Sequence, residues 1–449
     1  MILSVGKNLC SRLIKGVKGI QKMKLNYKRT ILAGLAFMSI SGFWGMYDAV
    51  TPLILKDSFH LNEVLNGVVM AMDNVFAIIL LPLFGIWSDK TNTKFGKRMP
   101  FIAVGTLLAV IAMFFMPFAD NARNLILFLV STGAVLLSMS FYRSPAVALM
   151  PDITPRELRS KGNAVIMLMG TAGVIYSMIM IKLLVKTPEG AATPNYMPLF
   201  LSMMIFMFVS TVVLILTVPE NKWSKEVKDN ETPEEKAENQ NAGKKISKAK
   251  LKSLIFILFS VFFWYMSYNA VNTAFSRYST QVLGLKDGSY ATYMLVATVI
   301  AVISYLPIGI ISSKLGRKKV IMAGVVGLAS AFLICTFVNG GGALLYILFG
   351  IVGISWGAIN VNSFPMAVEI ASDGDEGRYT GYYYTFSMAA QVLTPVLSGV
   401  FLQYVSYRAL FPYGVFFAAL AFFTMSQVKH GDIVTGQKKS LLEHFDVDD

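Results

Sequence analysis

Residues that bind metals or form disulfides are scarce in this sequence. It has two cysteines, Cys10 and Cys335, and three histidines, His60, His430 and His444, in 449 residues. The cysteines lie far apart and lack the spacing of a metal site or a disulfide framework. The sequence also has no glycine-rich nucleotide loop and no nucleophile paired with a histidine. These absences argue against an enzyme and against an ATP-driven pump, and we expect no cofactor and no metal.

Charge is also scarce, whereas apolar residues are abundant. Charged residues make up 15% of the chain and hydrophobic residues 55%, with a mean hydropathy of +0.58. A soluble protein of this length needs a polar surface that this composition does not supply, but a surface that faces lipid does not need one. The composition therefore predicts an integral membrane protein.

Apolar stretches of the length that crosses a bilayer as a helix, about 20 residues, recur along the chain. One polar interval, 219–252, divides them into two groups, and its mixed charge predicts a flexible linker. The twelve stretches lie near 31–55, 64–87, 99–119, 124–150, 162–186, 196–218, 254–281, 290–312, 319–338, 342–367, 379–404 and 408–428. We expect an all-α membrane protein with twelve transmembrane helices in two pseudo-symmetric six-helix bundles, 30–218 and 253–428.

The net charge of +14 is unevenly placed along the chain. The basic segment 1–29, the linker, the tail 429–449 and the loops on the same side hold 32 of the 40 Lys and Arg residues. Basic residues accumulate on the cytoplasmic side of a membrane. We therefore expect a multi-pass protein of the plasma (inner) membrane with both termini in the cytoplasm, and not a nucleic-acid-binding protein.

The segment 1–29 does not read as a cleaved signal peptide, because no apolar run is followed by a small-residue cleavage site. It is a helix that lies on anionic lipid, a tail without structure, or the product of a start upstream of the true one at Met23. The sequence leaves these alternatives open.

A loop motif occurs at equivalent places in the two halves, as expected of many secondary transporters. The first copy, Gly85 to Arg98, follows the second apolar stretch, and the second copy, Gly309 to Lys318, follows the eighth. Glycines allow helices to approach closely, and basic residues bind lipid headgroups. Ser313 of the second copy stands at the position that Asp89 occupies in the first copy. The residues that we expect to act in these loops are Gly85, Asp89, Gly96, Lys97, Arg98, Gly316 and Arg317.

This motif resembles the loop between the second and third helices of the major facilitator superfamily. Its ending, Phe95 to Phe101, is similar to that of the glycoside–pentoside–hexuronide:cation symporters, which include the plant sucrose–proton symporters and their animal relatives. A second block, Ser144 to Pro155, and its counterpart, Phe364 to Glu369, support the resemblance. We expect helix-end residues of these blocks to bind the arginine-rich loops and to act in the gate: Asp152, Arg159, Glu369 and Arg378.

The sequence departs from this family at one position of the fourth apolar stretch. Plant sucrose symporters carry a functional arginine five residues before the aspartate that matches Asp152. Val147 stands there in this chain, and the arginine is Arg143, one helical turn earlier. Positions four apart share a helix face, so we expect Arg143 to face the same cavity at another depth. The shift argues against sucrose itself as the substrate.

Ionisable residues inside a membrane are costly and indicate function. Asp48, Asp73, Arg143 and Arg277 lie within the apolar stretches. Depth along the helices, at about 1.5 Å per residue, suggests the pairs Asp73–Arg143 and Asp48–Arg277. We expect Asp48, Asp73 and Arg143 to form the site of the coupling ion, and Arg277 to act at an outer gate. The alternative is that these are static ion pairs that specify packing.

By the resemblance, the first, fourth, seventh and tenth helices line the central cavity. Here they are rich in aromatic and amide side chains, which stack on sugar rings and bind hydroxyl groups; the alternative is that they serve packing. We expect the substrate to bind Trp44, Tyr47, Arg143, Tyr268, Asn269, Asn272, Trp356, Asn360 and Ser363.

The favoured function is symport of a sugar or glycoside with a proton, by alternating access of the two halves. Sodium in place of the proton, efflux of amphipathic drugs or metabolites by proton antiport, and a non-transporting receptor or scaffold protein are the alternatives. The expected partners are a small solute, a proton or sodium ion and the lipid bilayer, with the chain as a monomer. The sequence leaves the solute, the ion and the direction of transport open.

Overall fold

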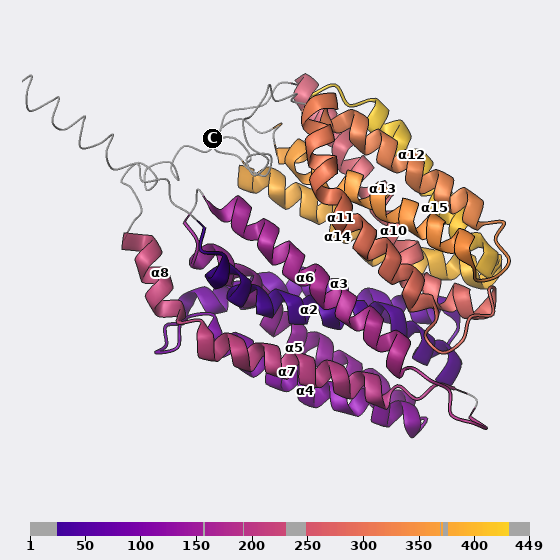
Figure 1. The fold of residues 1–449 in the computed structure, drawn as a ribbon, viewed down its shortest axis with the longest axis horizontal. Helices are drawn as coiled ribbons and strands as arrows, with labels where there is room; N and C mark the ends of the chain where they lie inside the picture. The colour runs from indigo at the N-terminus through magenta and orange to yellow at the C-terminus, as the bar shows by residue number, and fades with distance from the viewer. Residues whose placement is uncertain are drawn as a thin grey trace, which may run out of the picture.

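The computed structural model describes residues 25–155, 158–191, 193–229, 248–368, 370 and 376–430. Among these residues, twelve helices are long and apolar enough to cross a membrane. This number confirms the predicted fold class. Figure 1 shows the helices as two groups, coloured indigo to magenta for the first half of the chain and orange to yellow for the second.

The first half contains six spanning helices. They are α2 (Tyr27–Leu53, continued by the π-helical turn η1, Ile54–Ser58), α3 (Glu63–Lys90), α4 (Met99–Asn121), α5 (Leu125–Asp152), α6 (Arg159–Leu184) and α7 (Met197–Thr217). The side chains of Asn62 and Asn124 accept hydrogen bonds from Leu65 N (2.8 Å) and Leu127 N (3.0 Å), and so define where α3 and α5 begin.

The second half contains the other six. They are α10 (Lys248–Gln281), α11 (Tyr290–Leu315), α12 (Arg317–Cys335), α13 (Ala343–Val368), α14 (Glu376–Tyr404) and α15 (Leu410–Ser426), which follows the 3-10 turn η4 (Tyr407–Ala409). Gly316 joins α11 to α12 with a φ of +90°, a conformation that favours glycine. This residue ends one helix and begins the next within a single position.

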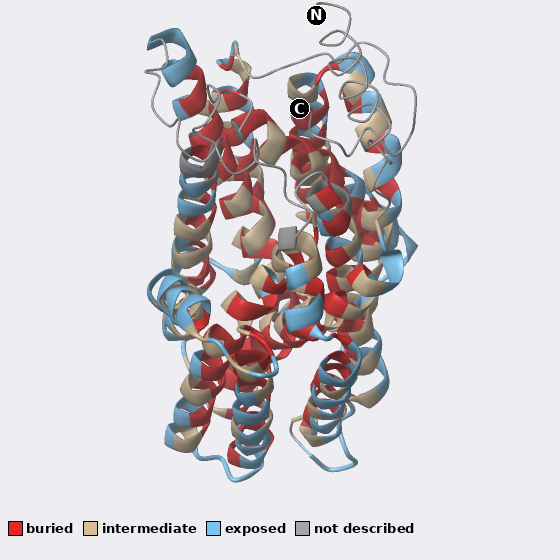
Figure 2. Cartoon of the chain, turned by 90° about the vertical axis from the view of Figure 1, so that its left-hand side faces the viewer, coloured by how far each residue is buried: buried red, intermediate tan, exposed pale blue. Residues whose placement is uncertain are grey.

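Close helix contacts through small residues hold each half together. A Cβ on Gly173 of α6 would lie 1.9 Å from the carbonyl oxygen of Met38 in α2, and one on Gly353 of α13 would lie 2.3 Å from that of Ala297 in α11. Such contacts are typical of membrane helices, which gain little from the hydrophobic effect inside lipid. Figure 2 shows that buried residues lie mainly toward the inside of the helix bundle and exposed residues mainly on its outer side.

Helices extend into two of the segments for which the sequence predicts no transmembrane helix. Helix α2 begins at Tyr27, inside the segment 1–29, whose first 24 residues lie outside the described ranges. The predicted linker 219–252 is helical at both ends, as α8 (Glu220–Asp229) and the start of α10. Trp223 of α8 is buried, and the Arg29 guanidinium lies 4.8 Å from the centre of its ring. These tertiary contacts explain why a polar segment forms a helix.

The helix bundle has two ends: the linker end, where the segment between the two halves lies, and the opposite end. The linker end carries α8, the turn 91–98 and the described residues of the connection 153–158. The opposite end carries the turns 59–62, 282–289 and 405–409 and the described residues of the connection 185–196.

Candidate functional site

A cavity of about 310 Å³ lies between the two halves. Residues of α2 and α6 line it from the first half, and residues of α10, α11 and α13 line it from the second. Its volume falls within the range of small-molecule sites, about 300–1,000 Å³. The polar side chains in its wall are Ser41, Asp48, Thr171, Asn272, Thr298 and Tyr305.

Stacked aromatic rings form one wall of this cavity. Tyr268 and Trp356 lie 3.8 Å apart between ring centres and 7° from parallel, and Tyr265 meets the same tryptophan edge-on at 5.4 Å. Trp44 stands in the wall contributed by the first half, and its buried Nε1 has no hydrogen-bond partner. Because buried donors are almost always paired, this N–H is available to a ligand.

Two carboxylates and one guanidinium lie together beside the cavity. Asp48 is in the cavity wall, and its charge interacts with those of Asp73 and Arg143. The Arg143 guanidinium lies 5.8 Å from the centre of the Trp44 ring, and Asp73 Oδ1 accepts a hydrogen bond from Asn74 Nδ2 at 2.6 Å. In the part of the chain that the structure describes, Arg143 forms no direct ion pair with either carboxylate. The group therefore carries one uncompensated negative charge when all three are ionised.

The predicted pair Asp48–Arg277 is wrong. Arg277 Nε lies 3.0 Å from Glu63 Oε2, and each of these side chains is 2% exposed. Depth along a helix does not specify which way a side chain points around it, and Asp48 instead lies in the cavity wall. Arg277 Nη1 also donates to Asn66 Oδ1 at 3.3 Å.

Four of the predicted substrate residues line the cavity: Trp44, Tyr268, Asn272 and Trp356. Ser363 instead bonds the Tyr383 hydroxyl at 2.9 Å, Tyr47 is buried against Phe43, and Asn360 lies at the Tyr305 hydroxyl. Asn269 is half-buried with an unpaired Nδ2, and neither it nor Arg143 is in the cavity wall.

Several wall residues of α6 and α11 were missed, namely Thr171, Thr298 and Tyr305. The resemblance pointed to the first, fourth, seventh and tenth helices, whereas the wall lacks the fourth and includes the fifth and the eighth. A search for hydroxyl side chains at helical spacing in those two helices would have found these residues.

The first copy of the loop motif forms a compact polar network at the linker end. Arg98 binds Asp89 and Ser88, and its Nε lies 2.8 Å from Asp152 Oδ2. Lys97 Nζ lies 3.0 Å from the same carboxylate oxygen. All of these residues belong to the first half, so the network ties α3, α4 and α5 to one another and not to the second half.

A residue of α8 that the sequence analysis did not single out completes this network. The Glu220 carboxylate is 2% exposed and accepts hydrogen bonds from the backbone N–H groups of Lys97, Arg98 and Met99 at 2.9–3.1 Å. Arg98, the N-cap of α4, makes no side-chain cap of its own, so a carboxylate 121 residues away caps this helix. Gly96 has a φ of +121°, and a Cβ there would lie 2.1 Å from Glu220 Oε2.

The second copy of the motif makes different contacts. Ser313 Oγ donates to the carbonyl of Ile310 in its own helix, and Lys318 Nζ donates to the carbonyls of Ser426 and Val428 at 2.8 and 2.6 Å. The aspartate contact of the first copy thus has no counterpart at Ser313. Glu369 and the side chains of Arg159 and Arg378 lie outside the described residues.

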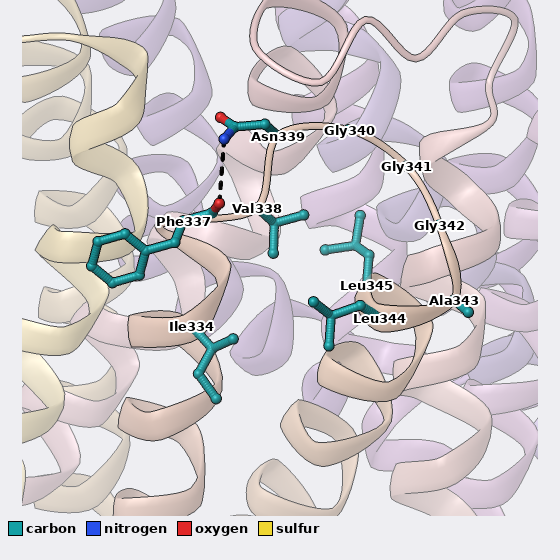
Figure 3. Close-up of a pocket in the computed structure, with 10 residues that line it drawn as sticks. All are labelled: Ile334, Phe337, Val338, Asn339, Gly340, Gly341, Gly342, Ala343, Leu344 and Leu345. Carbon is teal, nitrogen blue, oxygen red and sulfur yellow. Dashed lines mark hydrogen bonds between the residues drawn. The ribbon is translucent and has the colours of Figure 1, made fainter.

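A second hollow, of about 430 Å³, lies at the turn between α12 and α13 (Figure 3). Its wall is mostly backbone and apolar side chains, and Phe337 is 74% exposed. Its one amide side chain, Asn339, donates to the carbonyl of Phe337 at 3.4 Å. Because no polar groups converge there, we do not assign a ligand site to it.

The sequence matches the family described as MFS/sugar transport protein over residues 32–413. It is 24% identical to sucrose transport protein SUC3 of Arabidopsis thaliana over 42% of this chain and 36% of that protein. It is 28% identical to proton-associated sugar transporter A of Rattus norvegicus over 44% of this chain and 27% of that protein. The matched part of the chain thus spans about a third of the length of these curated relatives, or less.

Among solved structures, the fold is similar to that of the nucleoside transporter NupG. The TM-score is 0.65 at 16% identity, over 89% of this chain and 100% of that chain. At this identity the likeness shows the fold alone.

Proposed function

The chain belongs to the MFS/sugar transport protein family, and from this premise we propose that it carries a sugar or glycoside across a membrane in symport with a proton. The family and the fold are those of membrane transporters and not of enzymes. Transport by alternating access would open the cavity to one side of the membrane and then to the other.

The observation that carries the sugar assignment is the composition of the cavity wall. The stacked pair Tyr268–Trp356 offers a flat ring face, and Asn272, Thr171 and Thr298 offer groups that bind hydroxyls. A cavity for amphipathic drugs would be more uniformly apolar. The names of the two relatives, a sucrose transport protein and a proton-associated sugar transporter, support the same substrate class.

The coupling assignment depends on the carboxylates beside the cavity. Asp48, Asp73 and Arg143 interact without a direct ion pair, so one added proton would neutralise the group. Proton transport by a carboxylate requires surroundings that change between two conformations, and Arg143 provides a charge whose distance can change. Sodium at this place is the second candidate, since two carboxylates also attract a cation.

The orientation follows from the basic residues. We place the linker end in the cytoplasm, because it holds most of the Lys and Arg residues, and the opposite end outside. Side chains that join the two halves, such as Arg277 with Glu63 and Asp287 with Thr187, lie at the opposite end. The cavity then faces the cytoplasm in this conformation, which is the state that follows uptake across a plasma (inner) membrane.

Uptake of radiolabelled sugars into proteoliposomes tests this function. An inward proton gradient should drive accumulation, and a protonophore should abolish it. Accumulation that resists the protonophore and follows a sodium gradient would overturn the proton assignment. Uptake of none of a panel of mono- and disaccharides, by protein that shifts its thermal unfolding with another solute class, would overturn the sugar assignment.

A further inference from the structure

We propose that Glu63 and Arg277, together with Tyr407 and Lys56, form a latch that closes the outer end of the cavity and must separate each time that end opens. This proposal rests on the alternating access and the orientation proposed above. It assigns to Glu63 a gating role that depends on contact with the other half of the molecule.

The latch joins residues from the two halves of the chain. Glu63 lies at the start of α3, and its carboxylate accepts a hydrogen bond from the Tyr407 hydroxyl and lies 3.0 Å from Arg277 Nε. Lys56 of η1 lies 3.3 Å from Glu63 Oε1, and its Nζ is 5.6 Å from the centre of the Tyr407 ring. Glu63 is therefore the one member that contacts each of the other three.

Burial makes this contact sensitive to the separation of the halves. The Glu63 and Arg277 side chains are each 2% exposed, and a buried charge that loses its partner is strongly destabilising. Glu63 Oε2 and Arg277 Nε make no hydrogen bond among the described residues, so the ion pair between them is the interaction that compensates these two atoms. When the halves part, water must replace each partner. The group thus has two stable arrangements, paired and dry or separated and hydrated, which is the property of a gate.

The charges around Glu63 are balanced. Asp57 interacts electrostatically with Lys56, Glu63, His60 and Arg277. Glu63 and Asp57 supply two carboxylates to the group, and Lys56 and Arg277 supply two cations. Removing the Glu63 charge leaves the buried Arg277 of the second half without its ion-pair partner in the first half, which favours opening.

The backbones of the two halves also approach each other closely beside the latch. A Cβ on Gly67 would lie 2.2 Å from the carbonyl oxygen of Pro395, and one on Gly399 would lie 2.4 Å from that of Glu63. Val64 N donates to Gln403 Oε1 at 3.1 Å in the same region. These contacts bring α3 against α14 and exclude water from the latch.

Chemical labelling of a cysteine in the cavity tests the latch. Thr298→Cys places a thiol in the cavity wall, and a membrane-impermeant maleimide is added to the outer side of intact cells. With the latch weakened by Glu63→Gln, we expect the labelling rate to rise at least about tenfold, since each tenfold change in a population needs about 1.4 kcal/mol and loss of one partner of a buried pair costs more. An unchanged rate would overturn the proposal.

Three further variants keep the test decisive. Glu189→Gln removes an exposed carboxylate from a turn of the same end and should leave labelling unchanged. The exchange Glu63→Arg with Arg277→Glu should lower the rate toward that of the parent, and a rate equal to that of Glu63→Gln would contradict a paired latch. If Glu63→Gln does not fold, Tyr407→Phe removes only a hydroxyl and should raise labelling by a smaller factor; no rise would count against the latch. The assay needs neither transport nor a gradient, so its outcome is independent of the sugar and proton assignments.

Discussion

The two ends of the interface between the halves are held in different ways. At the opposite end, side chains cross from one half to the other: Arg277 to Glu63, Asp287 to Thr187 and Gln403 to Val64. At the linker end, Arg98 pairs with Asp152 inside the first half, and Lys318 bonds the Ser426 carbonyl inside the second. We infer that the contacts between the halves at the opposite end break in the proposed cycle, whereas contacts such as Arg98–Asp152 stabilise a single half.

Substitution in the charged group beside the cavity should have the largest effect, because this group is the proposed site of the coupling ion. Asp73→Asn removes a charge that interacts with Arg143. We expect gradient-driven accumulation to be lost while exchange of sugar across the membrane persists, since the binding wall is intact. Proteoliposome uptake with and without internal sugar measures both. Accumulation at the parent level would show that Asp73 is structural.

A substitution at the closed end should come next. In Gly67→Ala the new methyl would lie 2.2 Å from the carbonyl oxygen of Pro395, so α3 and α14 cannot close. We expect transport to fall severely, with the cavity accessible from outside in the labelling assay. Gly133→Ala is the matched control, because its Cβ would meet nothing within 4 Å. Equal transport and equal labelling of the two variants would contradict the inference that close contact of α3 with α14 closes this end.

A substitution at the linker end should lower the stability of the protein more than it raises the access to the cavity from outside. Glu220→Ala leaves three N–H groups of the α4 start without their acceptor. We expect a loss of about 1–3 kcal/mol in the free energy of unfolding, with little rise in external labelling. Thermal unfolding in detergent measures the first quantity. A large rise in external labelling would show that both ends depend on the same contacts.

The smallest effect is expected from a substitution in the exposed part of α8, the helix that also carries Glu220. Arg29 and Glu226 are 2.6 Å apart, but their side chains are 36% and 40% exposed. An exposed pair of this kind contributes about 1 kcal/mol or less, so Glu226→Ala should lower stability less than Glu220→Ala does. The reverse order would mean that α8 is held by its surface charge and not by the buried carboxylate.

The sequence was sufficient for the helices because the signal for them is local. Each apolar run predicts its own helix, and the repeated loop motif predicts the two halves. Contacts between helices were harder to predict. Glu63 is 344 residues from Tyr407, and at the start of a helix it looks like an ordinary N-terminal acid. The Asp48–Arg277 pair failed because depth does not specify the direction of a side chain, and Thr171 and Thr298 were missed because the resemblance directed attention to other helices.

Distances measured between spin labels across both ends test alternating access most directly. One label pair would join α3 to α14 at the opposite end, and another would join α5 to α13 at the linker end. On addition of a transported sugar, we predict two coupled changes. More molecules show a long distance at the opposite end, and in equal measure more molecules show a short distance at the linker end. Distances at the two ends that stay fixed, or that lengthen together, would contradict alternating access of the two halves.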